Sequence, residues 1–241
     1  MCIRDSISTC SKQLIFFFLH LGSGRLKLTA RGLLPLDPKV AKCEAKGGCS
    51  LVGDIRGDEN IALHSMHTLW VREHNRIVTE LKKLNKKWSG EKLFQEARKI
   101  VGAIFQHIVY TEWLPNIATL PTYHRYNQYY DSSIINAFAS AAFRFGHSLI
   151  PNAFSQVDMG YNKMREDMLL QKAFFNTDFI HKNGIESTMM GLSANQSNEV
   201  LMRILYYIIS SISCDRLRVH LLVSFKLFLA NGNLRKFSFC I

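Results

Sequence analysis

The spacing of apolar residues between positions 61 and 108 constrains the fold more than any other feature. From Ile61 to Leu84, apolar side chains recur at intervals of three, four and seven, the pattern of an amphipathic helix with one face toward a core. Asp58 or Asn60 can cap the start of this helix, because a short polar side chain accepts hydrogen bonds from the first free amides. We therefore predict a helix over residues 61–84.

A second helix is predicted directly after the first. Ser89 can cap its start, and Glu91 then lies in the first turn, where the helix dipole favours a negative charge. Apolar residues continue with helical spacing to Ile108, and Pro115 ends the pattern. These two segments predict a pair of consecutive helices.

A third helix is predicted from Ile134 to about His147, with Pro151 beyond its end. Asp131 to Ser133 can open it, and its Ala and Phe residues make it apolar nearly all round. A helix of that kind is normally buried. Because no convincing set of alternating strands is present, the predicted fold class is mainly α.

The charge of the chain restricts the kind of partner. Its 241 residues carry a formal net charge of +11, which favours anionic partners without choosing among nucleic acid, a membrane surface and small acidic ligands. The apolar run Leu14–Leu21 is far shorter than the roughly 20 residues that span a bilayer. We therefore expect no membrane span.

The chain divides into segments of different character. Residues 1–21 are expected to be a leader, either a signal peptide or a foreign segment. Residues 22–60 are rich in loops, and their Cys43 and Cys49 could form a tight disulfide or remain two free thiols, with a zinc pair less favoured. Residues 203–241 form an apolar tail without a clear amphipathic stripe.

Three groups of residues could carry chemistry. The charged turn of residues 53–59 contains Arg56, which could stabilise a small anion, although the pattern alone favours a solvated turn with capping acids. His64, His67 and His74 share one helix face and could bind zinc, or simply form a polar stripe. His147 follows Gly146 and could be an axial ligand of haem, or a core histidine.

Four blocks in the same order resemble the animal haem peroxidases. The resemblance covers roughly residues 22–200 and weakens after Pro151. The four blocks are Gly53–Glu59, His64–Arg76, Gln95–Ala103 and Asn136–Ile150. They imply a partial haem peroxidase domain over residues 22–202, mainly helical and with a loop-rich N-terminal part.

The resemblance implies a role for each matching residue. His147 matches the proximal histidine that binds the haem iron, and Arg56 matches the distal arginine of the peroxide pocket. Glu59 matches the glutamate that forms an ester with haem b, whereas Asn60 stands where some members have a methionine linked to the haem. Cys43 and Cys49 resemble a disulfide of the family. The three helix histidines become ordinary helix residues under this interpretation.

The implied reaction is the reduction of hydrogen peroxide, with oxidation of a halide or a small anionic or phenolic donor. The family's distal histidine, its haem-linking aspartate and its calcium-binding loop match no residue of this chain, so we expect weak or no activity from the chain by itself. The family implies an extracellular, secreted protein with a possible matrix partner and a response to oxidative stress, and no nucleic acid. The alternative hypothesis is a non-catalytic helical module that binds a partner through its basic surface.

Overall fold

The computed structural model describes residues 22–38, 43, 48–52, 54, 56–116, 122, 125, 128–129, 133–134, 136–140 and 142–198. The expectations for residues 1–21 and 203–241, and for the helix start at residues 131–132, lie outside this part of the chain. The chain forms two compact units, one with residues 7–106 and 152–194, the other with residues 1–6, 107–151 and 195–241. Each is described by itself.

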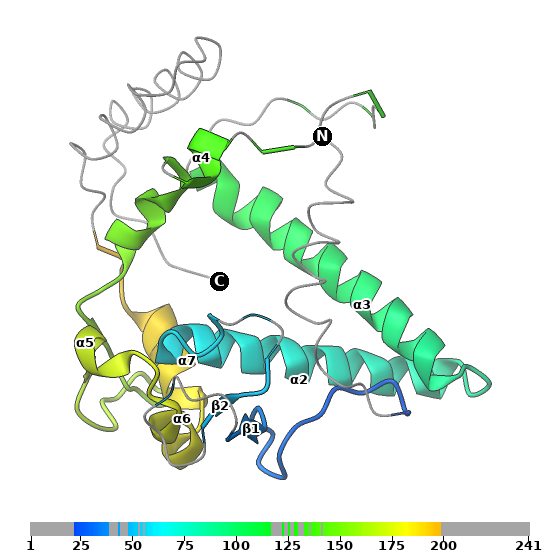
Figure 1. The fold of residues 1–241 in the computed structure, drawn as a ribbon, viewed down its shortest axis with the longest axis horizontal. Coiled ribbons are helices and arrows are strands. Elements are labelled where there is room, and N and C mark those ends of the chain that lie inside the picture. Colours follow the sequence, from blue (N-terminus) through cyan, green and yellow to red (C-terminus); the bar gives the residue numbers. More distant parts are fainter. Residues whose placement is uncertain are drawn as a thin grey trace. The chain divides into compact units, whose positions relative to one another are not determined.

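The larger unit is built on α2 (Ile61–Leu84), the long cyan helix of Figure 1. The predicted bounds of this helix are confirmed. Asn60 caps it, because its side-chain oxygen accepts hydrogen bonds from the amides of Ala62 and Leu63, each at 3.0 Å. Asp58, the other candidate cap, instead accepts hydrogen bonds from Ser50 and His64.

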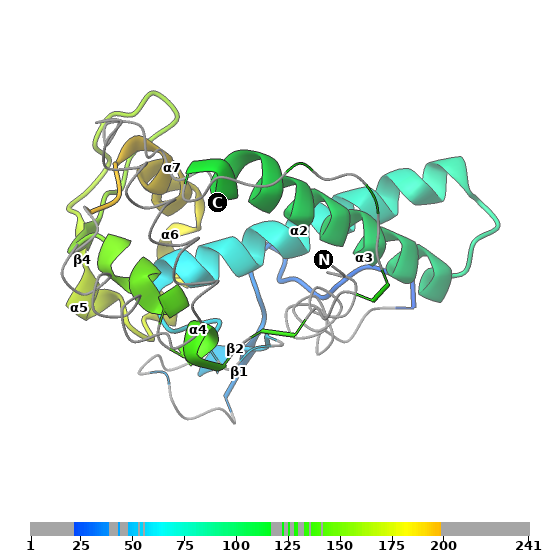
Figure 2. The same ribbon diagram turned by 90° about the horizontal axis from the view of Figure 1, so that it is seen from above.

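The second predicted helix is also confirmed. It is α3 (Gly90–His107), and the amide of Lys92 donates to the Ser89 hydroxyl at 3.3 Å. Figure 1 shows α2 and α3 diverging from the turn that joins them, and Figure 2 shows the same turn from above. The chain then continues through one π-helical segment, η1 (Ile108–Trp113), and a short 3₁₀ turn, η2 (Leu114–Asn116).

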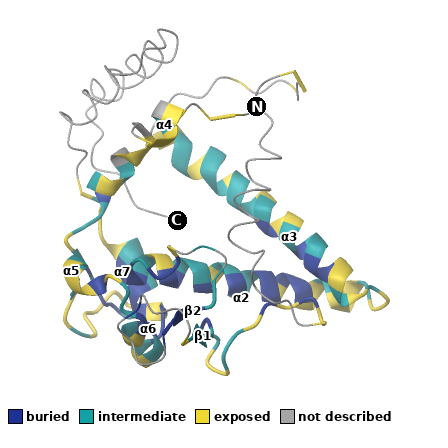
Figure 3. Ribbon diagram, in the orientation of Figure 1, coloured by how far each residue is buried: buried dark blue, intermediate teal, exposed yellow. Residues whose placement is uncertain are grey.

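The core lies where α2, α3 and the segment before α2 meet, as the dark blue stretches of Figure 3 show. The amide group of Asn75 on α2 holds that segment by accepting from the Leu26 amide (2.7 Å) and donating to the Leu26 carbonyl (2.9 Å). The buried residues of this core are Leu26, Leu34, Val71, Ile77, Val78, Leu93, Phe94, Ala97 and Val101. Removal of their apolar surface from water stabilises this packing by about 25 cal/mol for each Å² buried.

Short elements complete the larger unit. Two antiparallel pairs form, β1 (Leu36–Asp37) with β2 (Cys49–Ser50), and β3 (Ala153–Phe154) with β4 (Met168–Leu169). The helices α5 (Leu170–Ala173), α6 (Thr177–Asn183) and α7 (Glu186–Ala194) follow, and α6 and α7 pack against α2. The fold class is mainly α, as predicted.

The third predicted helix is wrong in two respects. The segment forms a short α4 (Asn136–Ser140) and a separate 3₁₀ segment, η3 (Ala142–Leu149), instead of one continuous helix. It is also largely exposed: Ile134 and Phe143 keep more than half of their surface accessible. Burial of an apolar helix depends on a partner surface, and the sequence of the helix does not contain that surface.

Candidate functional site

Arg56 lies in the charged turn that leads into α2, and it is paired with Asp54. The guanidinium donates from Nε to one carboxylate oxygen at 2.9 Å and from Nη2 to the other at 2.6 Å, and the Arg56 amide also donates to Asp54 at 2.9 Å. This hydrogen-bonded pair lowers the pKa of Asp54 to about 2. The Arg56 side chain is still 68% exposed, so solvent reaches it.

Asp58 lies in the same turn, but its carboxylate is buried. It accepts hydrogen bonds from the amide of Ser50 and from Nδ1 of His64, the latter at 2.7 Å. Burial raises the pKa of Asp58, but the hydrogen bonds from His64 and Ser50 outweigh it and hold the pKa below its ordinary value. Asp58 therefore ties the turn to both β2 and α2.

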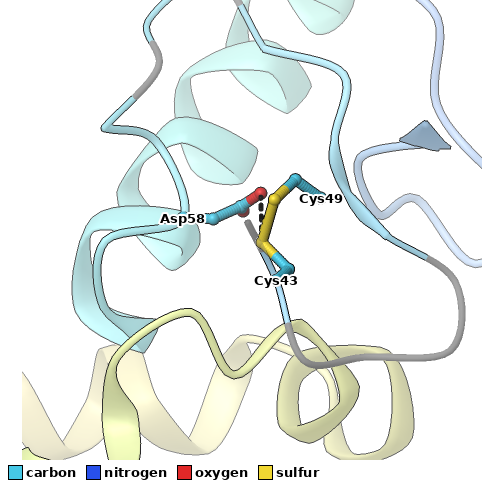
Figure 4. A group of neighbouring side chains, drawn as sticks. All are labelled: Cys43, Cys49 and Asp58. Atoms are coloured by element: carbon cyan, nitrogen blue, oxygen red, sulfur yellow. Dashed lines mark hydrogen bonds between the residues drawn. A yellow bond between two sulfur atoms is a disulfide. The ribbon is translucent and has the colours of Figure 1, made fainter. Parts of the chain in front are cut away.

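Cys43 and Cys49 form a disulfide, which confirms the tight loop. Figure 4 shows the bond beside the Asp58 carboxylate, with 3.8 Å between Cys43 Sγ and an Asp58 oxygen. These three residues are the one cluster of potential metal ligands among the described residues. Because both sulfurs are bonded to each other, neither is a thiolate, and the cluster is not a metal site.

Glu59 follows Asp58 and is fixed by its backbone. Its amide donates to the Arg56 carbonyl at 2.9 Å, and its carbonyl accepts from the Phe175 amide at 3.2 Å. The side chain is half-buried, and no hydrogen bond or ion pair is found for its carboxylate among the described residues. The carboxylate is therefore available to a ligand.

His147 lies in η3 with an exposed side chain. Its carbonyl accepts from the Ile150 amide at 3.4 Å, and its ring has no hydrogen-bond partner within the described part of the chain. A Cβ placed on the neighbouring Gly146 would meet no atom within 4 Å. The imidazole is thus accessible, which differs from the expected position at the end of a buried helix.

Two of the three helix histidines have structural roles in the larger unit. His64 binds Asp58, as described, and the buried His74 lies with its Nε2 3.2 Å from the Gly24 carbonyl. His67 lies between them on α2, and burial lowers its pKa. No metal-binding cluster that includes them is found among the described residues.

The structure brings Arg56 and Glu59 together in one turn of the larger unit, and it places His147 in the other unit. Residues 18–213 match a family of known proteins, the animal haem peroxidases. The chain belongs to this family. The match contains all four blocks of the resemblance, and with them Arg56, Glu59 and His147.

Individual relatives agree with this assignment. The chain is 47% identical over 152 residues to a human protein named peroxidasin homolog, covering 60% of this chain and 10% of the relative. It is 40% identical over 197 residues to human myeloperoxidase, covering 73% of this chain and 26% of the relative. The chain thus spans only about a tenth to a quarter of these animal haem peroxidases.

Solved structures show the same fold. Peroxidase A from Dictyostelium discoideum matches with a TM-score of 0.68 and 26% identity over 77% of this chain and 38% of that one. A fatty acid alpha-dioxygenase from Arabidopsis thaliana matches with a TM-score of 0.58 at 16% identity, over 77% of this chain and 34% of that one, which shows a shared fold alone. No helix in the described part of the chain is long and apolar enough to cross a membrane.

The Asp58–His64 pair is the feature that the sequence did not predict. Asp58 lies six residues before His64 and outside the helix that contains His64. Helical spacing therefore does not link the two side chains. The signal that could have indicated the pair is chemical: an acid and a histidine flank the start of an amphipathic helix whose cap is already supplied by Asn60.

Proposed function

We propose that this chain is part of a haem peroxidase domain that reduces hydrogen peroxide and oxidises a halide or a small organic donor. The observation that carries the proposal is the family match over residues 18–213, since this range holds Arg56, Glu59 and His147 within matching blocks. The solvent exposure of the Arg56 and His147 side chains supports it.

The donor groups fit haem b in their chemistry. His147 presents an exposed imidazole without a hydrogen-bond partner among the described residues, next to the open space at Gly146, and would bind the iron. Glu59 presents a half-buried carboxylate that would form the ester. Haem, when bound, would supply the iron that exchanges electrons with peroxide.

Arg56 would act on the peroxide by stabilising negative charge on its oxygens. Its guanidinium is held in one orientation by Asp54, which limits the rearrangement needed when a small ligand arrives. An arginine does not accept a proton at ordinary pH, so peroxide activation also needs a base. The resemblance assigns the family's distal histidine to no residue here, and we infer a rate about 10²–10⁴-fold below that of a complete site.

The proposed setting is extracellular, because the disulfide Cys43–Cys49 persists in oxidising compartments. The proposed electron donors are small anions or phenols. The net charge of +11 would favour the approach of the anionic donors. The same charge favours the second candidate function, a non-catalytic module that binds an anionic partner, such as one in the extracellular matrix.

The test is peroxide-dependent oxidation of a phenol by the chain loaded with haemin, compared with free haemin. We expect the loaded chain to oxidise the phenol faster than free haemin does. Arg56→Gln should reduce this difference in rate by about 10²-fold or abolish it. Arg76→Gln is the matched control, because Arg76 forms the same two-bonded pair with Glu73. Equal rates for the loaded chain and free haemin would contradict the proposal.

A further inference from the structure

The turn between α2 and α3 carries a concentration of positive charge. Residues 79–92 contain five lysines and two glutamates, and all five lysines are exposed. An exposed arginine from the segment before α2 adds to them. We call this set the basic turn; its members are Arg25, Lys82, Lys83, Lys86, Lys87 and Lys92.

Most of this charge is not neutralised by acids. Lys83 pairs with Glu80 at 2.7 Å, whereas no other member of the basic turn forms an ion pair with a described residue. Basic residues elsewhere in the larger unit, such as Arg76 and Lys99, are paired with an acid one helical turn away. The basic turn is therefore a local source of positive potential.

A hollow of about 450 Å³ lies beside the basic turn, and three of its members contribute to the lining. Arg25, Lys82 and Lys83 line it, together with Ser23, Thr79 and the backbone at Gly90. This volume lies within the range of roughly 300–1,000 Å³ typical of small-molecule pockets. A single acidic group could enter the hollow while neighbouring groups of the same ligand contact the lysines outside it.

The backbone of the basic turn is held in place by its own contacts. The Lys82 ammonium donates to the carbonyls of Lys86 (2.8 Å) and Trp88 (3.0 Å), and the Trp88 amide donates to the Asn85 carbonyl at 3.0 Å. The Lys92 ammonium lies 4.5 Å from the centre of the Trp88 ring. A backbone that is already fixed loses less entropy when a ligand binds.

We propose that the basic turn binds a sulfated polysaccharide, with one sulfate in the hollow and others along Lys86, Lys87 and Lys92. A chain of cations that extends beyond one hollow fits a linear polyanion better than a single small anion. The choice of a polysaccharide over a nucleic acid rests on the extracellular setting proposed above. Binding involves neither Arg56 nor His147, so its failure and the failure of the peroxidase proposal are separate results.

The test measures the Kd of the full chain for heparin at several NaCl concentrations. The variant combines Arg25→Gln, Lys86→Gln and Lys87→Gln. We expect its Kd to rise at least tenfold, and the slope of log Kd against log salt to become shallower by about 2–3, because each of the three lost contacts releases about 0.7–0.9 counterion fewer. The substituted side chains are exposed, so circular dichroism should be unchanged.

A variant with the same loss of charge elsewhere serves as control: Lys99→Gln, Lys163→Gln and Lys172→Gln. We expect its Kd to change less than threefold. Equal weakening in both triple variants would overturn the proposal, because net charge alone would then explain binding. Equal binding of desulfated heparin, or tighter binding of a single-stranded DNA of the same length, would also overturn it.

Discussion

At the residue scale, Asp54 and Asp58 show how surroundings divide the roles of two nearby acids. Asp54 faces an arginine that is largely exposed, whereas Asp58 is buried between a backbone amide and a histidine. The first acid orients a side chain that solvent can reach. The second acid holds the turn itself, so the two should respond differently to substitution.

The Arg56–Asp54 pair predicts a change in the titration of Asp54. The pKa of Asp54, about 2 in the folded chain, should rise toward its ordinary value of 3.8 in Arg56→Gln. Because the folded value is the lower one, the pair stabilises the fold above pH 3.8, and this stabilisation is lost as the pH falls toward 2. Solvent limits the effect to about 1 kcal/mol or less.

Carboxylate chemical shifts followed by NMR during an acid titration measure this pKa directly. Arg76→Gln leaves the Asp54 pair intact and should not move its titration. An unchanged Asp54 titration in Arg56→Gln would show that the pair is not formed in solution.

Substitution of Asp58 should cost more stability than loss of the surface pair. In Asp58→Asn, an amide group would face the donors of Ser50 and His64, and we expect the free energy of unfolding to fall by about 1–3 kcal/mol. The folded pKa of Asp58 is lowered, so its contribution is present above the ordinary aspartate pKa and is lost as the pH falls further.

Urea unfolding between pH 3 and pH 7 tests both parts of this prediction. The variant should be less stable at pH 7, and its stability should fall less steeply in acid than that of the wild type. Identical acid profiles would contradict the role given to the buried carboxylate.

At the element scale, the start of α2 depends on one side chain. Asn60 satisfies two amides of the first turn, so Asn60→Ala should lower the free energy of unfolding by about 1 kcal/mol. Asn60→Ser keeps a capping oxygen and should retain most of the stability. Urea unfolding of both variants measures the difference, and equal losses in the two would show that the cap itself is not responsible.

The disulfide fixes the loop beside Asp58. Removing it in the double variant Cys43→Ser, Cys49→Ser should lower the free energy of unfolding by about 2 kcal/mol, the value expected from chain entropy for a loop of this length. A reducing agent should destabilise the wild type by a similar amount and leave the double variant unchanged. Equal sensitivity of both proteins to the reductant would assign the effect to other cysteines.

The sequence predicted the elements whose signals are local. The bounds of α2 followed from its apolar spacing and the polar residue before it, and Ser89 marked the start of α3. The change from α4 to the 3₁₀ segment η3 was not predicted. The apolar run continues across it, and the surfaces that pack against this run cannot be identified from the run itself. The strands were missed because a strand of two residues is too short to show alternation of apolar and polar side chains.

For the site, the resemblance proposed residues but could not give their contacts. The resemblance singled out Arg56, while its pairing with Asp54 depends on the conformation of the turn. The burial of Asp58 depends on β2 and α2 meeting, which is a tertiary event. Roles carried over from a family therefore needed the structure to show which side chains are engaged and which are accessible.

At the scale of the whole molecule, the chain combines a well-packed unit with a more exposed one. The larger unit holds the core, the disulfide and the charged turn, whereas His147 belongs to the unit with residues 107–151. Among the residues that the proposed function assigns to haem, His147 is the one that would bind the iron. The central claim is therefore that His147 binds the iron.

Absorption titration of the full chain with haemin, in the wild type and in His147→Ala, tests this claim most directly. The wild type should bind one haemin with the shifted Soret band of an imidazole ligand, and His147→Ala should lose that band position or bind at least tenfold more weakly. His107→Ala serves as control and should match the wild type. An unchanged spectrum and affinity in His147→Ala would contradict the account.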